Sequence, residues 1–214
     1  GEIRGQIQGV VHAYVDGDVN VSLLSGTEEE EPDSGSFKWG VTISTNYFPK
    51  DNSKYFDGCN LNMMQWFAQY SPEQLETMRG FLGRMLFSGD DVYKPVSVLS
   101  GGEKTRLALA TLVTSRANVL LLDEPTNNLD IYHATNLMRI VRRLCDELGK
   151  TVILVLHEIN YAAFYSDYIC AFVDGKIAKF GTVQEVITKE NLSDIYKVDF
   201  EIMQIEGKPL SIYY

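Results

Sequence analysis

A run of four apolar residues, followed at once by two carboxylates, constrains this chain more than any other stretch. Val119 to Leu122 is too short for a buried helix and is bounded by polar residues, which favours a buried parallel strand. Pro125 ends this strand, because proline cannot donate to a sheet ladder. We therefore expect Asp123 and Glu124 at the carboxyl end of a strand, where open α/β sheets bind ligands. One carboxylate there can hold Mg²⁺ while the other orients or deprotonates a water molecule.

A pair of glycines opens the helical stretch that comes before this strand. Gly101 and Gly102 follow Ser100 and lead into residues 103–116, whose apolar residues recur at helical spacing. Ser100 can cap this helix, and the free N–H groups at its N-terminus suit a phosphate. An ordinary capped helix is the alternative interpretation of the same residues.

Composition and charge limit the classes of function. With 214 residues and 45% hydrophobic residues, the chain can form one large or two small domains around a proper core. The net charge of -10 gives no strong signal for nucleic-acid binding. The cysteines lack metal-ligand spacing, and Cys145 and Cys170 indicate buried thiols in a reducing compartment. Since the sequence shows neither a leader nor an apolar run of about 18 residues, we expect a cytoplasmic protein without a membrane span.

The two motifs together resemble the ATP-binding cassette (ABC) ATPases. LSGGEK at residues 99–104 is similar to the signature motif, and LLLDEPTNNLD at residues 120–130 is similar to the Walker B motif and D-loop. The resemblance implies ATP and Mg²⁺ as cofactors, with Asp123 on the metal and Glu124 as catalytic base. It also implies a head-to-tail homodimer, or pairing with a second ABC subunit that holds most of the ATP. The remaining nucleotide contacts that it implies are Ser100, Gly101, Gly102, Glu103 and Asp130.

His157 follows the strand expected at residues 151–156, where this family carries its switch histidine. By resemblance it would contact the γ-phosphate and link the attacking water to the base. We expect Asp123, Glu124 and His157 to lie at the tips of neighbouring strands, because the nucleotide must meet all of them.

The fold class implied is α/β, similar to the P-loop NTPases, with a mostly parallel sheet and flanking helices. A helical subdomain at about residues 60–98 and small β-hairpins would complete an ABC-type core at residues 32–214, after a poorly matched β-rich segment at residues 1–31. The elements expected outside the motifs are strands at 36–44 and 151–156, helices at 61–87, 132–148, 158–167 and 183–196, and hairpins at 169–180 and 200–213.

The phosphate loop of the family is not recognisable in this sequence. G-x-x-x-x-G-K-[ST] has no match, and Lys38 is the first lysine of the chain. The glutamine that contacts Mg²⁺ in this family (the Q-loop) would stand near Thr45-Asn46, where there is none. We therefore expect weak or absent ATP hydrolysis, so the chain is an ATP hydrolase by resemblance only. The alternative is a non-catalytic, chimeric or designed ABC-like scaffold.

The resemblance divides between two lineages. Residues 32–130 look like the ABC-F subfamily, cytosolic proteins that mostly act on ribosomes. Residues 131–214 look like the ATPase subunits of iron–siderophore importers, through LHEINYAA at 156–163 and QIEGKP at 204–209. The chain thus resembles a mosaic, natural or engineered. A ribosome is the partner implied by the first lineage, and a membrane subunit by the second.

Overall fold

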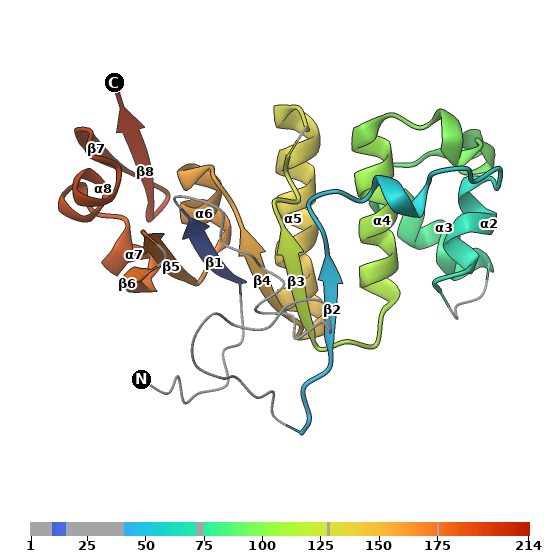
Figure 1. Ribbon diagram of the computed structural model, residues 1–214, viewed down its shortest axis with the longest axis horizontal. Helices are drawn as coiled ribbons and strands as arrows, with labels where there is room; N and C mark the ends of the chain where they lie inside the picture. Colours follow the sequence, from blue (N-terminus) through green and yellow to red (C-terminus); the bar gives the residue numbers. More distant parts are fainter. Residues whose placement is uncertain (1–9, 16–40, 72–74, 128, 175) are drawn as a thin grey trace.

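A six-stranded sheet runs through the molecule in the order β2-β3-β4-β1-β5-β6 (Figure 1). The computed structural model describes residues 10–15, 41–71, 75–127, 129–174 and 176–214. Neighbouring strands are parallel except β5 and β6, which form an antiparallel hairpin. The strands of this sheet are β1 (Val10–Val15), β2 (Thr45–Phe48), β3 (Val119–Asp123), β4 (Thr151–Val155), β5 (Tyr168–Val173) and β6 (Lys176–Thr182).

Helices flank the sheet and gather at its two ends. Figure 1 shows α2, α3 and α4 together beyond β2, and α7 and α8 at the opposite end with a second, two-stranded sheet. The antiparallel strands of that small sheet are β7 (Phe200–Ile205) and β8 (Lys208–Tyr213). The α-helices are α2 (Met63–Ala68), α3 (Leu75–Arg84), α4 (Gly101–Thr114), α5 (Ile131–Leu148), α6 (Ile159–Tyr165), α7 (Val183–Val186) and α8 (Lys189–Tyr196). Short 3-10 helices are η1 (Ser53–Tyr55), η2 (Gly89–Tyr93) and η3 (Val96–Val98).

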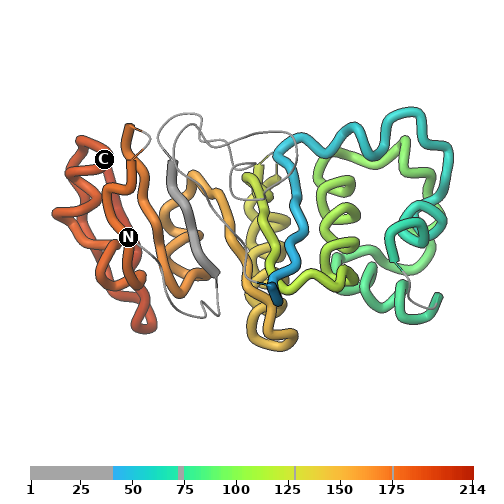
Figure 2. The backbone as a smooth tube through the Cα atoms, turned by 60° about the horizontal axis from the view of Figure 1, so that its bottom comes forward, coloured from blue at the N-terminus to red at the C-terminus, as the bar shows by residue number. Residues whose placement is uncertain are grey.

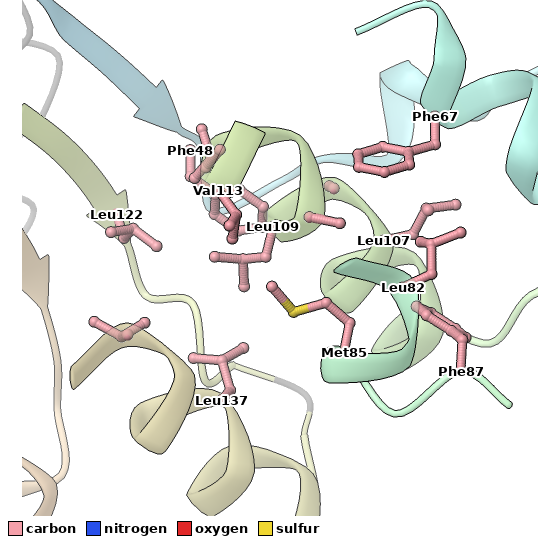
Figure 3. Close-up of a cluster of buried hydrophobic side chains, with 14 of the residues drawn as sticks. Phe48, Phe67, Leu82, Met85, Phe87, Leu107, Leu109, Val113, Leu122 and Leu137 are labelled. Carbon is pink, nitrogen blue, oxygen red and sulfur yellow. The ribbon is translucent and has the colours of Figure 1, made fainter. Parts of the chain in front are cut away.

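One apolar core joins the sheet to the helices beyond β2. Figure 3 shows Leu122 of β3 and Leu137 of α5 in the same cluster as Leu82 of α3 and Phe67 of α2. These side chains are at most 2% exposed. Each buried side chain of this size contributes about 1.5–3 kcal/mol. The strand that presents the two carboxylates is therefore fixed by packing along its whole length.

A second core supports the C-terminal hairpin. Phe200 of β7 packs with Ile169 of β5 and Val183 of α7. Asn160 of α6 also binds the hairpin through its side-chain amide, which donates to the carbonyl of Ser211 at 3.1 Å and accepts from its N–H at 2.8 Å. Figure 2 shows this C-terminal part at one end of the molecule and the helices of residues 60–98 at the other.

The expected fold class is confirmed: the sheet is mostly parallel, helices flank it, and small hairpins accompany it. The buried strand at β3, the strand at β4, the long helix α5 and both hairpins lie where the sequence pattern predicts them. The described cysteines are all free thiols. Burial raises the pKa of Cys170 to about 11, which agrees with an unreactive core thiol.

Three expected elements differ from the structure. The strand expected at 36–44 begins at Thr45 instead; just before it, the N–H of Ser44 donates to the side chain of Asn118, and its carbonyl accepts from the N–H groups of Asn118 and Val119. The helix expected at 61–87 is two helices, α2 and α3, with Pro72 between them; proline disfavours helix at the residue before it. The helix expected at 183–196 is likewise divided, because Thr188 starts α8 by accepting from the N–H of Asn191 at 3.2 Å.

The structure describes one part of the β-rich segment expected at 1–31, namely β1. Residues 1–9 and 16–31 lie outside the described residues, and so do residues 36–40 of the expected first strand of the core.

Candidate functional site

Three adjacent parallel strands end at one edge of the sheet and deliver the polar residues of the site. Asp123 is the last residue of β3 and pairs with Val155, the last residue of β4. Glu124 follows β3 directly, while His157 stands two residues beyond β4 and Lys50 two residues beyond β2. The expectation that Asp123, Glu124 and His157 lie at the tips of neighbouring strands is therefore confirmed.

Glu124 is the centre of this group. Its Oε1 atom lies 2.9 Å from Nζ of Lys50 and 2.7 Å from Nε2 of His157, and its Oε2 atom lies 3.4 Å from the side-chain amide of Asn127. The Glu124 side chain is 13% exposed, whereas those of Lys50 and His157 are more than half exposed. Burial acts to raise the pKa of Glu124, but hydrogen bonds and positive charge from Lys50 and His157 outweigh burial and lower this pKa. The carboxylate is thus held in its ionised form, as a general base requires.

The backbone at Glu124 is strained. Its φ of 44° lies in the left-handed region, which non-glycine residues rarely adopt. The conformation is held on both sides, because the N–H of Glu124 donates to Val155 at 3.2 Å and its carbonyl accepts from Asn127 at 2.9 Å. Such strain concentrates at functional sites, where the surrounding structure fixes the side chain.

Asp123 lies beside Glu124 and has a different electrostatic environment. Burial, and then the charge of Glu124, raise the pKa of Asp123, although a hydrogen bond from Tyr47 at 3.4 Å opposes this. A cation near Asp123 would relieve this repulsion. Among the described residues there is no group of three acidic, histidine or cysteine side chains that could hold a metal alone. A single carboxylate oxygen fits Mg²⁺, which is usually bound by one or two carboxylates together with water and substrate phosphates.

The glycine-fronted helix α4 begins with a complete capping box. Ser100 donates to Glu103 through its N–H and its hydroxyl, both at 2.8 Å, and its hydroxyl accepts from the N–H of Glu103 at 3.3 Å. The predicted cap is therefore confirmed. Gly102 lies against the D-loop, because a Cβ atom at this position would stand 3.0 Å from Cδ2 of Leu129, whereas Gly101 faces open space. The start of α4 thus lies in close contact with Leu129, which precedes α5.

Asp130 has a structural role that the sequence pattern did not reveal. Its carboxylate caps α5 by accepting from the N–H of His133 at 2.8 Å, and it contacts Nδ1 of the same histidine at 2.8 Å. These hydrogen bonds lower the pKa of Asp130. An aspartate directly before a helical run is the signal that could have predicted this cap.

Lys50 and Tyr47 are site residues that sequence reasoning missed. The glutamine of the Q-loop was expected near Thr45-Asn46; the structure places both residues inside β2, where they pair with Val119 and Leu120. The first cation beyond the end of β2 is Lys50. Had the end of this strand been predicted at Phe48, Lys50 would have been expected at the edge of the sheet where Asp123 lies.

The carboxyl end of β1 lies at the same edge as Asp123, because β1 runs parallel to both β4 and β5. In the resembled family the phosphate loop would follow this strand. The residues that follow Val15 lie outside the described residues, and their sequence, Asp16-Gly17-Asp18, contains no lysine.

Comparison with known proteins identifies the family. The family model described as "ABC transporter" matches residues 21–127, which is half of the chain. The ABC transporter ATP-binding protein YkpA of Bacillus subtilis is 59% identical over 117 residues, or 54% of this chain and 21% of that protein. The petrobactin import ATP-binding protein FatE of Bacillus anthracis is 44% identical over 115 residues, or 54% of this chain and 46% of that protein. The chain therefore spans less than half the length of either relative.

Solved structures agree on the fold. The RNase-L Inhibitor superposes with a TM-score of 0.73 at 22% identity, over 96% of this chain and 40% of that one. A dimeric bacterial ABC transporter cassette, MJ0796, superposes with a TM-score of 0.65 at 17% identity, over 82% of this chain and 85% of that one. Among the described residues there is no helix with the length and apolar character needed to cross a bilayer. By its motifs, its family-model match and its fold, the chain belongs to the ABC transporter ATP-binding family.

Proposed function

We propose that the chain binds ATP with Mg²⁺ at the edge formed by β2, β3 and β4, and that its intrinsic hydrolysis is slow. The observation that carries this proposal is the position of Glu124, whose Oε1 atom contacts both Lys50 and His157 where these strands end. A carboxylate that is largely shielded from solvent and has two cationic or hydrogen-donating partners suits the activation of a water next to an anionic substrate.

Each residue of the edge has a distinct part in this proposal. Glu124 accepts the proton of the attacking water, and His157 holds Glu124 and contacts the terminal phosphate. Asp123 contributes an oxygen ligand to Mg²⁺, which supplies charge neutralisation when it is bound. Slow turnover is expected because the sequence lacks the glycine cradle and lysine that usually bind the phosphates and stabilise the transition state.

Binding and hydrolysis should be measured separately. Isothermal titration of the chain with Mg²⁺-ATP tests binding, and a melting temperature that rises with ATP supports it. Phosphate release then tests chemistry, since Glu124→Gln should lower the rate by at least about 100-fold without abolishing binding. Glu190→Gln, on the exposed surface of α8, is the matched control. An equal rate of phosphate release in the unaltered chain and in Glu124→Gln would contradict catalysis by this site.

A second candidate function is a non-catalytic module that completes the site of another ABC subunit. The close approach of Leu129 to Gly102 favours it, because it brings the D-loop and the signature segment together. In this case Ser100, Gly101 and Gly102 would contact ATP bound to a partner with its own phosphate loop. ATP-dependent association with a complete ABC subunit, measured by sedimentation, supports this function. Association that is the same with and without ATP contradicts it.

We propose that residues 32–130 derive from an ABC-F-like protein and residues 131–214 from a siderophore-importer ATPase, natural or engineered. YkpA, an ABC transporter ATP-binding protein, and FatE, a petrobactin import ATP-binding protein, each match about half of the chain, which is what a mosaic of two relatives would give. Separate alignment of the two segments is the test. Residues 32–130 should be more similar to YkpA, and residues 131–214 to FatE; a uniform preference for either relative along the chain would refute the mosaic.

A further inference from the structure

Lys50 is a cation that lies next to both carboxylates of the site, Asp123 and Glu124. Its Nζ atom lies 2.9 Å from Oε1 of Glu124, and its backbone makes a hydrogen bond to the carboxyl of Asp123. The position of its backbone is fixed by the sheet, because Phe48, two residues earlier, pairs with Leu122 and is 3% exposed. The backbone of Lys50 is therefore fixed, while its long, flexible side chain allows the ammonium group to move.

The ammonium group of Lys50 is accessible to a ligand. Its side chain is 54% exposed, although its partner Glu124 is largely buried. His157 contacts the same oxygen of Glu124 from the neighbouring strand, so the carboxylate and the imidazole both lie within reach of a group bound beside Lys50. A terminal phosphate carries more than one negative charge and three acceptor oxygens, and it can bind an ammonium without displacing the contact to Glu124.

The sequence gives this lysine particular weight. The phosphate loop of the family would supply a lysine to the β- and γ-phosphates, and the chain has no match to that loop. We propose that Lys50 binds the terminal phosphate of ATP and so replaces part of the charge of the missing loop lysine. This inference rests on the proposed ATP-binding function. It adds Lys50, which follows β2, to the residues proposed to contact phosphate. The motifs read from the sequence assigned no cation to this strand.

The test compares ATP with ADP, because only ATP carries the terminal phosphate. Lys50→Met keeps the length of the side chain and removes its charge, while Lys50→Arg keeps the charge. We expect Lys50→Met to weaken ATP binding by about tenfold, the value of one charged hydrogen bond, and ADP binding by less than about twofold. Lys50→Arg should retain most of the preference for ATP. Lys54→Met, which changes an exposed lysine over the ring of Tyr55, is the control.

A second experiment distinguishes binding of the phosphate by Lys50 from neutralisation of the Glu124 charge by Lys50. The Lys50→Met change is repeated in Glu124→Gln, and affinities are measured by titration in EDTA and in Mg²⁺, with melting curves to confirm folding. A tenfold loss of ATP affinity in both backgrounds supports the proposal. A loss that disappears in Glu124→Gln, or an equal loss for ATP and ADP, overturns it. If the unaltered chain binds neither nucleotide, the proposed function fails and this inference fails with it.

Discussion

The Nε2 atom of His157 lies 2.7 Å from Oε1 of Glu124, so the imidazole that follows β4 contacts the carboxylate that follows β3. The two residues are far apart in the sequence and are brought together by the parallel pairing of β3 with β4, in which Asp123 pairs with Val155. Lys50 approaches the same oxygen from β2. The charge state of Glu124 is thus controlled by residues on both neighbouring strands.

The first prediction concerns the pH dependence of hydrolysis. Hydrogen bonds from Lys50 and His157 lower the pKa of Glu124 against the effect of burial. His157→Ala removes one of these donors, so the pKa of Glu124 should rise and the acid limb of the rate profile should move to higher pH. His157→Gln keeps a hydrogen-bond donor and should shift the limb less. Phosphate release measured from pH 4 to pH 8 at saturating ATP checks this, and an unmoved acid limb in His157→Ala would be inconsistent with the proposed base.

The second prediction concerns the strained backbone at Glu124. Its φ of 44° suits glycine, and a left-handed conformation costs other residues about 1–2 kcal/mol. Glu124→Ala and Glu124→Gly both lose the contacts of the side chain, but only glycine relieves the strain. Glu124→Gly should therefore be more stable than Glu124→Ala by about 1 kcal/mol in urea unfolding. Equal stabilities would mean that the φ value does not strain the native state.

The third prediction uses the two glycines of the signature segment as a matched pair. A Cβ atom at Gly101 meets open space, whereas one at Gly102 would stand 3.0 Å from Leu129. Gly101→Ala should be neutral or stabilising by up to about 1 kcal/mol, since alanine favours the helix. Gly102→Ala should be less stable than Gly101→Ala by about 1 kcal/mol, because Leu129 must move to make room for the added methyl group. Thermal or urea unfolding of both variants checks the difference, and Gly102→Ala as stable as Gly101→Ala would show that Leu129 moves at no cost.

The fourth prediction concerns stability at acid pH. Arg142 of α5 binds Asp146 at 3.0 Å and Asp167, beyond α6, at 2.7 Å. The hydrogen bond from Arg142 lowers the pKa of Asp146 below its ordinary value of 3.8, so this stabilisation is present above pH 3.8 and is lost as the pH falls through the lowered pKa. Arg142→Met should cost about 0.5–1 kcal/mol at pH 7, and the loss should shrink in acid.

The control for this prediction is Arg143→Met. Arg143 pairs with Glu147 one turn along the exposed surface of the same helix, so its loss should cost less than the loss of Arg142. Chemical unfolding at pH 7 and below pH 3.8 measures both variants. A cost for Arg142→Met that stays constant with pH would contradict the assigned partner.

Local pattern determined much of this protein. The apolar run of β3, the capped helix that starts at Ser100 and the two hairpins each depend on residues close together in the sequence, and each lies where it was predicted. The motifs at residues 99–104 and 120–130 identified the family for the same reason, because each is a short continuous stretch of sequence. The fold class and the strand-end position of Asp123, Glu124 and His157 followed from these elements.

Only the tertiary structure decided which side chains meet. The register of β2 against β3 put Lys50 beside Glu124, although the sequence pattern had placed that strand at 36–44 and the Q-loop position near Thr45-Asn46. The approach of Gly102 to Leu129 likewise joins segments whose contact no periodicity predicts. The physical reason is that strand order and register are set by packing between distant segments, and a shift of two residues along β2 would move the lysine by more than the length of a hydrogen bond.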